Sequence, residues 1–171
     1  ILVLSGSPRN RWPLIEMASS ITHERNIMTV ASIVSKEDMD AEKIKDAEQA
    51  MRSYLEKNQV RSFVRVLPAA DPFRGSTQLV GSYGLGAYVP NIILLGFNDS
   101  PETLTQYLEM LTYFRRMDRN IILVRPGEEE QQNNDLFATR PKRIDVWWGG
   151  LNNNGSLLII LAHLIRSSHR W

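Results

Sequence analysis

Small residues and one arginine directly follow the first apolar stretch of the chain. Residues 1–4 are aliphatic and β-rich, and residues 5–9 read Ser-Gly-Ser-Pro-Arg. A small-residue loop between a strand and a helix can bind phosphate, because backbone amides and the helix dipole favour negative charge there. Ser5, Gly6, Ser7 and Arg9 are therefore candidate nucleotide-binding residues. An ordinary turn with a capping serine explains the same letters equally well.

A second candidate loop follows the longest strand-like apolar run. Residues 92–95 read Ile-Ile-Leu-Leu, which is typical of a strand covered on both faces, and Gly96 to Ser100 follow. In a sheet of order 3-2-1-4-5, this loop and the first one meet at the switch point, where open α/β sheets bind ligands. Gly96 and Asn98 are therefore added to the candidate nucleotide site. Asp99 and Pro13 oppose an anion, by charge and by lack of an amide.

The elements that must position these loops alternate between strand and helix. We expect strands near residues 27–34, 62–67 and 120–124, with Pro68 halting the second of these, and helices over 13–21, 39–55, 104–114 and 156–168, with a weaker one over 75–84. This alternation predicts one α/β lobe over 1–171, a doubly wound, mostly parallel sheet with helices on both faces. Residues 144–148 are expected to add a sixth strand.

Composition excludes several classes of function. Twenty basic and nineteen acidic residues give a net charge of +1, so we expect no nucleic-acid partner. The absence of cysteine excludes disulfides and thiolate metal sites. His23, His163 and His169 are scattered, and no metal-ligand spacing or catalytic triad is found, so we expect no catalytic or metal site.

Three further segments carry expectations that are not chemical. Gly84 and Gly86 precede the apolar run and indicate a tight connection at the sheet edge opposite the switch point. Residues 128–142 are polar and predict a mobile loop. Trp147 and Trp148 are candidates for core packing or for an interface.

Two motifs in the right order give a more specific indication. Residues 84–86 with 90–97, followed by Ile-Asp-Val-Trp-Trp at 144–148, Gly155 and the closing Arg-Trp, resemble the cytosolic C-terminal domain of the cation-chloride cotransporters. The similarity extends over nearly the whole chain.

The resemblance implies a non-catalytic regulatory and assembly domain. Such a domain is related to the universal stress fold, lies beneath a transmembrane unit at the cytoplasmic face of the membrane, and commonly forms a homodimer. The partners it implies are the transmembrane domain of the same protein and a second copy. Some members bind ATP; the compact chain indicates a prokaryotic member excised from a longer protein, for which we expect no cofactor or only weak ATP binding. The alternative is a separate nucleotide- or flavin-binding protein of stress-protein or flavodoxin type.

Overall fold

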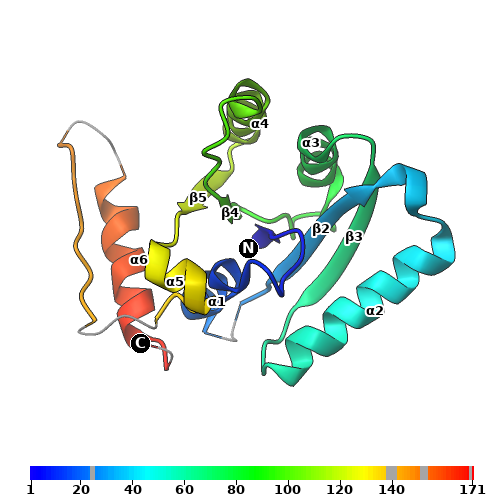
Figure 1. Cartoon of the computed structure of the whole chain (residues 1–171). Helices are drawn as coiled ribbons and strands as arrows, with labels where there is room; N and C mark the ends of the chain where they lie inside the picture. The colour runs from blue at the N-terminus through cyan, green and yellow to red at the C-terminus, as the bar shows by residue number, and fades with distance from the viewer. Residues whose placement is uncertain (24–25, 138–141, 151–153, 170) are drawn as a thin grey trace.

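The computed structural model describes residues 1–23, 26–137, 142–150, 154–169 and 171 (Figure 1). The elements in chain order are β1 (Leu2–Leu4), α1 (Trp12–Thr22), β2 (Thr29–Ser35), the 3-10 helix η1 (Lys36–Asp38), α2 (Ala41–Lys57), β3 (Phe63–Ala69), α3 (Pro72–Ser82), β4 (Ile92–Gly96), α4 (Leu104–Arg116), β5 (Asn120–Val124), α5 (Glu128–Asn133) and α6 (Gly155–Ser167).

The strands form one parallel sheet in the order β3-β2-β1-β4-β5. Leu2 of β1 is in register with Thr29 of β2 on one side and with Ile93 of β4 on the other. Because the chain reverses its winding direction between β1 and β4, their carboxyl ends form the switch point. The predicted α/β class, strand order and parallel arrangement are confirmed.

The predicted sixth strand is wrong. Residues 142–149 have no regular secondary structure, and in Figure 1 this segment runs beside α6, on the side away from the sheet. Its alternating apolar pattern resembles a strand, but the segment lies beside α6 and does not pair with the outer edge of β5, where the sheet ends.

Helices cover both faces of the sheet, as Figure 1 shows: α1 and α2 lie on one side, α3 and α4 on the other. Val3, Val30 and Leu94 point to the α1 and α2 side, whereas Leu2 and Ile93 point to the α3 and α4 side, as the two-residue period of a strand requires. Each face thus has its own apolar cluster, and β1 is buried on both faces.

Local signals explain where several elements begin and end. Asp71 caps α3 by accepting hydrogen bonds from the amides of Phe73 (3.3 Å) and Arg74 (2.9 Å), so this helix starts earlier than the glycines at 75–84 indicated. Pro68 does not halt β3, which continues to Ala69; β3 is an edge strand, where a missing amide is tolerated.

A third layer lies outside α1. Leu161, Leu164 and Ile165 of α6 pack against the core cluster on that side. His23, at the left-handed C-cap of α1, donates its Nε2 hydrogen to the carbonyl of Leu164 at 2.7 Å. The predicted polar loop contains α5 at its start; its mobility stays a prediction.

Candidate ligand crevice at the switch point

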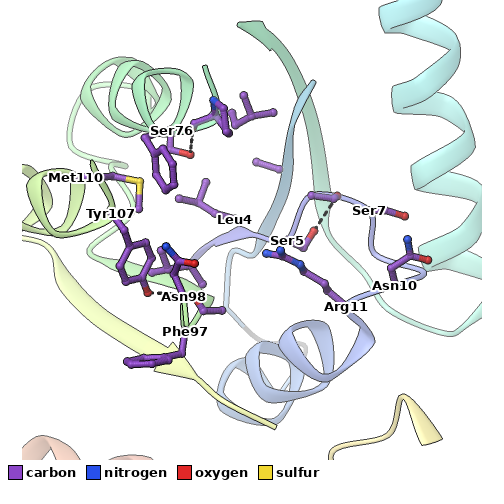
Figure 2. Close-up of a pocket in the computed structure, with 17 residues that line it drawn as sticks. Leu4, Ser5, Ser7, Asn10, Arg11, Ser76, Phe97, Asn98, Tyr107 and Met110 are labelled. Atoms are coloured by element: carbon purple, nitrogen blue, oxygen red, sulfur yellow. Dashed lines mark hydrogen bonds between the residues drawn. The ribbon is translucent and has the colours of Figure 1, made fainter. Parts of the chain in front are cut away.

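A cavity of about 390 Å³ opens at the carboxyl ends of β1 and β4 (Figure 2). The residues that line it are Leu4, Ser5, Gly6, Ser7, Asn10 and Arg11 around β1, Ala31 and Ile33 of β2, Pro72, Phe73 and Ser76 of α3, Leu95, Gly96, Phe97 and Asn98 around β4, and Tyr107 and Met110 of α4. One wall is therefore polar loop and the other is the apolar side of α3 and α4.

Five of the six predicted site residues line this cavity. Ser5 is fully buried, with its amide donating to the carbonyl of Ala31 at 3.1 Å and its hydroxyl donating to the carbonyl of Gly6 at 3.2 Å. Gly6 has a φ of +63°, a left-handed conformation that glycine adopts without strain. The loop between β1 and α1 is therefore fixed by backbone geometry, and Ser7 is among the residues that line the cavity.

Arg9 is the predicted residue that the structure keeps out of the cavity. Its guanidinium lies over the ring of Tyr54 of α2, 5.7 Å from the ring centroid. It lines a different, shallow depression together with Lys57. An aromatic face attracts a cation, which accounts for its position away from the switch point.

Arg11 takes the place expected for Arg9. It is exposed, and a Cβ built on Gly96 would lie 3.7 Å from its Nη1. Figure 2 shows the guanidinium directed into the cavity. Among the described residues that line the cavity, Arg11 is the one charged side chain. Arg11 is the N-cap residue of α1 and makes no side-chain capping hydrogen bond, and the sequence carries no signal that separates it from Arg9.

The residues after β4 hold their own loop in shape. Asn98 donates from Nδ2 to Oγ1 of Thr103 at 2.9 Å and accepts at Oδ1 from the amide of Ser100 at 3.2 Å. Asp99 pairs with Arg125 at 3.4 Å and is not among the residues lining the cavity. The repulsion expected from Asp99 is therefore weaker than the sequence indicated.

Tyr107 closes the floor of the cavity on the α4 side. Its hydroxyl donates to the carbonyl of Gly96 at 3.0 Å. Burial raises the pKa of Tyr107 above its ordinary value of 10.0. The phenol is thus neutral and acts as a hydrogen-bond donor near neutral pH.

The amides at the start of α1 are already engaged. The amide of Trp12 donates to Oδ1 of Asn134 at 3.2 Å, and the amide of Leu14 donates to the carbonyl of Arg11 at 3.1 Å. Pro13 between them has no N–H. A phosphate at this helix end would have to displace Asn134, a residue that sequence reasoning missed because it lies far along the chain.

The remaining predicted features lie outside the cavity. Leu85 and Tyr88 form a two-residue turn with paired backbone hydrogen bonds of 3.2 and 2.9 Å, which confirms the tight connection between Gly84 and β4. Trp147 is 88% exposed. Trp148 packs on the start of α6, since a Cβ on Gly155 would lie 2.9 Å from its ring.

The described residues contain neither a cluster of metal ligands nor a membrane-spanning helix. Within the ranges that the structure describes, no three His, Asp or Glu side chains are grouped so that they could hold a metal ion. In the same part of the chain, none of the helices has the length and apolar character needed to cross a membrane.

Comparison with known proteins identifies the family. The model for "Solute carrier family 12" matches residues 11–128. "Solute carrier family 12 member 3" of Mus musculus is 22% identical over 196 residues, which cover 99% of this chain and 19% of the mouse protein. The Homo sapiens member 3 is 21% identical over 213 residues, covering 99% of this chain and 21% of that protein. "Solute carrier family 12 member 9" of Homo sapiens is 27% identical over 111 residues, covering 63% of this chain and 12% of its own length. The chain, which spans about a fifth of the member 3 relatives, therefore belongs to solute carrier family 12.

Proposed function

We propose that this chain is a cytoplasmic regulatory and assembly domain of a secondary transporter that moves chloride together with potassium, sodium or both. It has no catalytic role in this proposal. Its partners are the transmembrane domain of the same protein and a second copy of the chain, and nucleic acid is not among them.

The family and the share of its relatives that the chain spans support a part played inside a larger transporter. The observation that carries a regulatory role is the cavity at the switch point, with Arg11 directed into it. Open α/β sheets bind small ligands at this place, which supports a role for this cavity in binding a regulatory ligand. Arg11 favours an anionic ligand, and Phe73, Tyr107 and Met110 offer it an apolar wall.

A transport assay on the full-length protein that carries this chain tests the proposal. Arg11→Ala removes the charge from the cavity, and Arg9→Ala removes a nearby arginine that lies against Tyr54 instead. We expect Arg11→Ala to change chloride-dependent rubidium uptake at least twofold, at an unchanged amount of protein in the membrane, whereas Arg9→Ala leaves uptake as in the parent.

Equal uptake by Arg11→Ala, Arg9→Ala and the parent would contradict regulation through the cavity. The visible spectrum of the purified chain distinguishes the alternative function. A bound flavin absorbs visible light, and such absorbance would favour a flavin-binding protein over a transporter domain.

A further inference from the structure

Residues 134–137 connect the end of α5 to the start of α1, and we call this segment the latch. The side chain of Asn134 bridges two backbone groups: its Oδ1 accepts from the amide of Trp12 at 3.2 Å, and its Nδ2 donates to the carbonyl of Arg9 at 2.8 Å. Both groups lie in the turn that leads from the cavity loop into α1. One side chain thus caps a helix that begins 122 residues earlier in the chain.

A second attachment lies one turn further along α1. The amide of Leu136 donates to Oε2 of Glu16 at 2.7 Å, and Glu16 is only 5% exposed. A hydrogen bond to a buried carboxylate is stronger than one between neutral groups. The side chain of Leu136 also packs against the apolar cluster between α1 and the sheet. The latch is therefore held by polar and apolar contacts together.

The geometry of α5 directs Asn134 toward its target. Asn134 is the C-cap of α5 and has a φ of +50°, and the amide of Asp135 donates back to the carbonyl of Glu130 at 3.1 Å. Asparagine is among the residues that adopt this left-handed conformation most readily. Figure 1 shows α5 next to α1, in agreement with these hydrogen bonds.

We propose that Asn134 is a positioning residue for the switch-point cavity and that the latch holds the cavity loop in its present shape. Asn10 and Arg11, which line the cavity, lie between the two backbone groups that Asn134 bridges. Release of the latch frees the Trp12 amide and loosens Arg11. The latch and the switch-point cavity are thereby coupled. A ligand that binds one shape of the cavity loop more tightly shifts the latch toward its attached or its released state. This inference concerns the fold of the chain and does not rest on the proposed role in transport.

Hydrogen exchange of the isolated chain, with its own two-cluster core, tests the inference. Asn134→Gly removes the side chain while keeping the left-handed backbone accessible. Loss of its hydrogen bonds should make amides in a peptide spanning residues 5–16 exchange at least fivefold faster, while peptides from β4 and α4 exchange as in the parent. Asn133→Ala is the matched control, because Asn133 is the exposed neighbour on α5.

Two further variants separate the side chain from the backbone. Asn134→Asp keeps an oxygen for the Trp12 amide but loses the donor to Arg9, so its exchange should fall between the parent and Asn134→Gly. Leu136→Ala loosens the latch without changing Asn134, and the same peptide should exchange faster. If residues 5–16 exchange at the parent rate in both Asn134→Gly and Leu136→Ala, the latch does not position the cavity loop and the inference is wrong.

Discussion

The α/β part of the chain and the segment beyond it differ in how they cover their apolar side chains. Within residues 1–124, Leu94 and Phe114 are fully buried between sheet and helices. In the C-terminal segment, Trp147 is 88% exposed and Ile159 is 61% exposed, and Gly155 is the one buried residue of α6. Both parts expose some large apolar side chains, Leu85 at 82% among them, but the buried apolar core lies within residues 2–124. Exposed apolar side chains in a segment without a buried core of its own are typical of a region that contacts another molecule or domain.

The largest expected effect comes from truncating matched aromatic residues in the two parts. Phe114→Ala removes a fully buried ring and should lower the free energy of unfolding by ~3 to 5 kcal/mol. Trp147→Ala should lower it by less than ~0.5 kcal/mol and act on self-association instead. Urea unfolding and sedimentation measure the two quantities. A large loss of stability in Trp147→Ala would show that its ring is covered within the domain.

Added methyl groups sharpen the same contrast. A Cβ on Gly75 of α3 would lie 2.6 Å from Cγ2 of Ile33 and 2.7 Å from Cβ of Ala69. Gly75→Ala should therefore destabilise the chain by ~1 to 3 kcal/mol, although alanine favours a helix. Gly149→Ala is the control, because its Cβ would meet nothing within 4 Å. Thermal unfolding measures the effect. A lower melting temperature for Gly149→Ala than for Gly75→Ala would contradict this expectation.

Deprotonation of Tyr107 at high pH should have a smaller effect on the free energy of unfolding. Burial raises the pKa of Tyr107, so the folded chain favours the neutral phenol. This contribution to stability is complete below pH ~10 and is lost as the pH rises through the folded-state pKa. Tyr107→Phe should cost ~1 kcal/mol at pH 7 by losing the hydrogen bond to Gly96. The variant should also lose less stability than the parent above pH 10.

Tyr88→Phe is the matched control for that measurement, because Tyr88 is 77% exposed. It should follow the parent at every pH. If the free energy of unfolding falls equally steeply above pH 10 in the parent and in Tyr107→Phe, Tyr107 does not cause this loss of stability.

Local patterns predicted most of the α/β part because its strands are continuous apolar runs and its connections are short. The alternation predicts a parallel sheet, and the order 3-2-1-4-5, which was assumed and which the structure confirms, brings Ser5 and Gly96 to one cavity. The prediction of a sixth strand was wrong because alternation in 144–148 does not tell whether the segment pairs with the edge of β5 or packs beside α6, as it does. Asn134 could not be identified from the sequence as a residue near the cavity, because its contact with Trp12 joins positions 122 residues apart.

Sequence patterns do not decide which of Arg9 and Arg11 points into the cavity. Both arginines precede α1, and only Asn10 separates the one against Tyr54 from the one in the cavity. The sequence places the start of this helix within one residue of Trp12, so the boundary does not decide between the two arginines; the ring of Tyr54 on α2, which attracts the Arg9 guanidinium, does.

The smallest expected effect is the response to ATP. The cavity has the position of a phosphate site, but Asn134 occupies the Trp12 amide, Pro13 has none, and the Leu14 amide is engaged. Arg11 alone then meets the phosphates, and one exposed charge contributes little in water. We expect a dissociation constant no tighter than ~100 μM for ATP with magnesium, equivalent to about −5.5 kcal/mol, in calorimetric titration. A micromolar constant that Gly6→Val abolishes would contradict this expectation and make nucleotide sensing the leading function of the cavity.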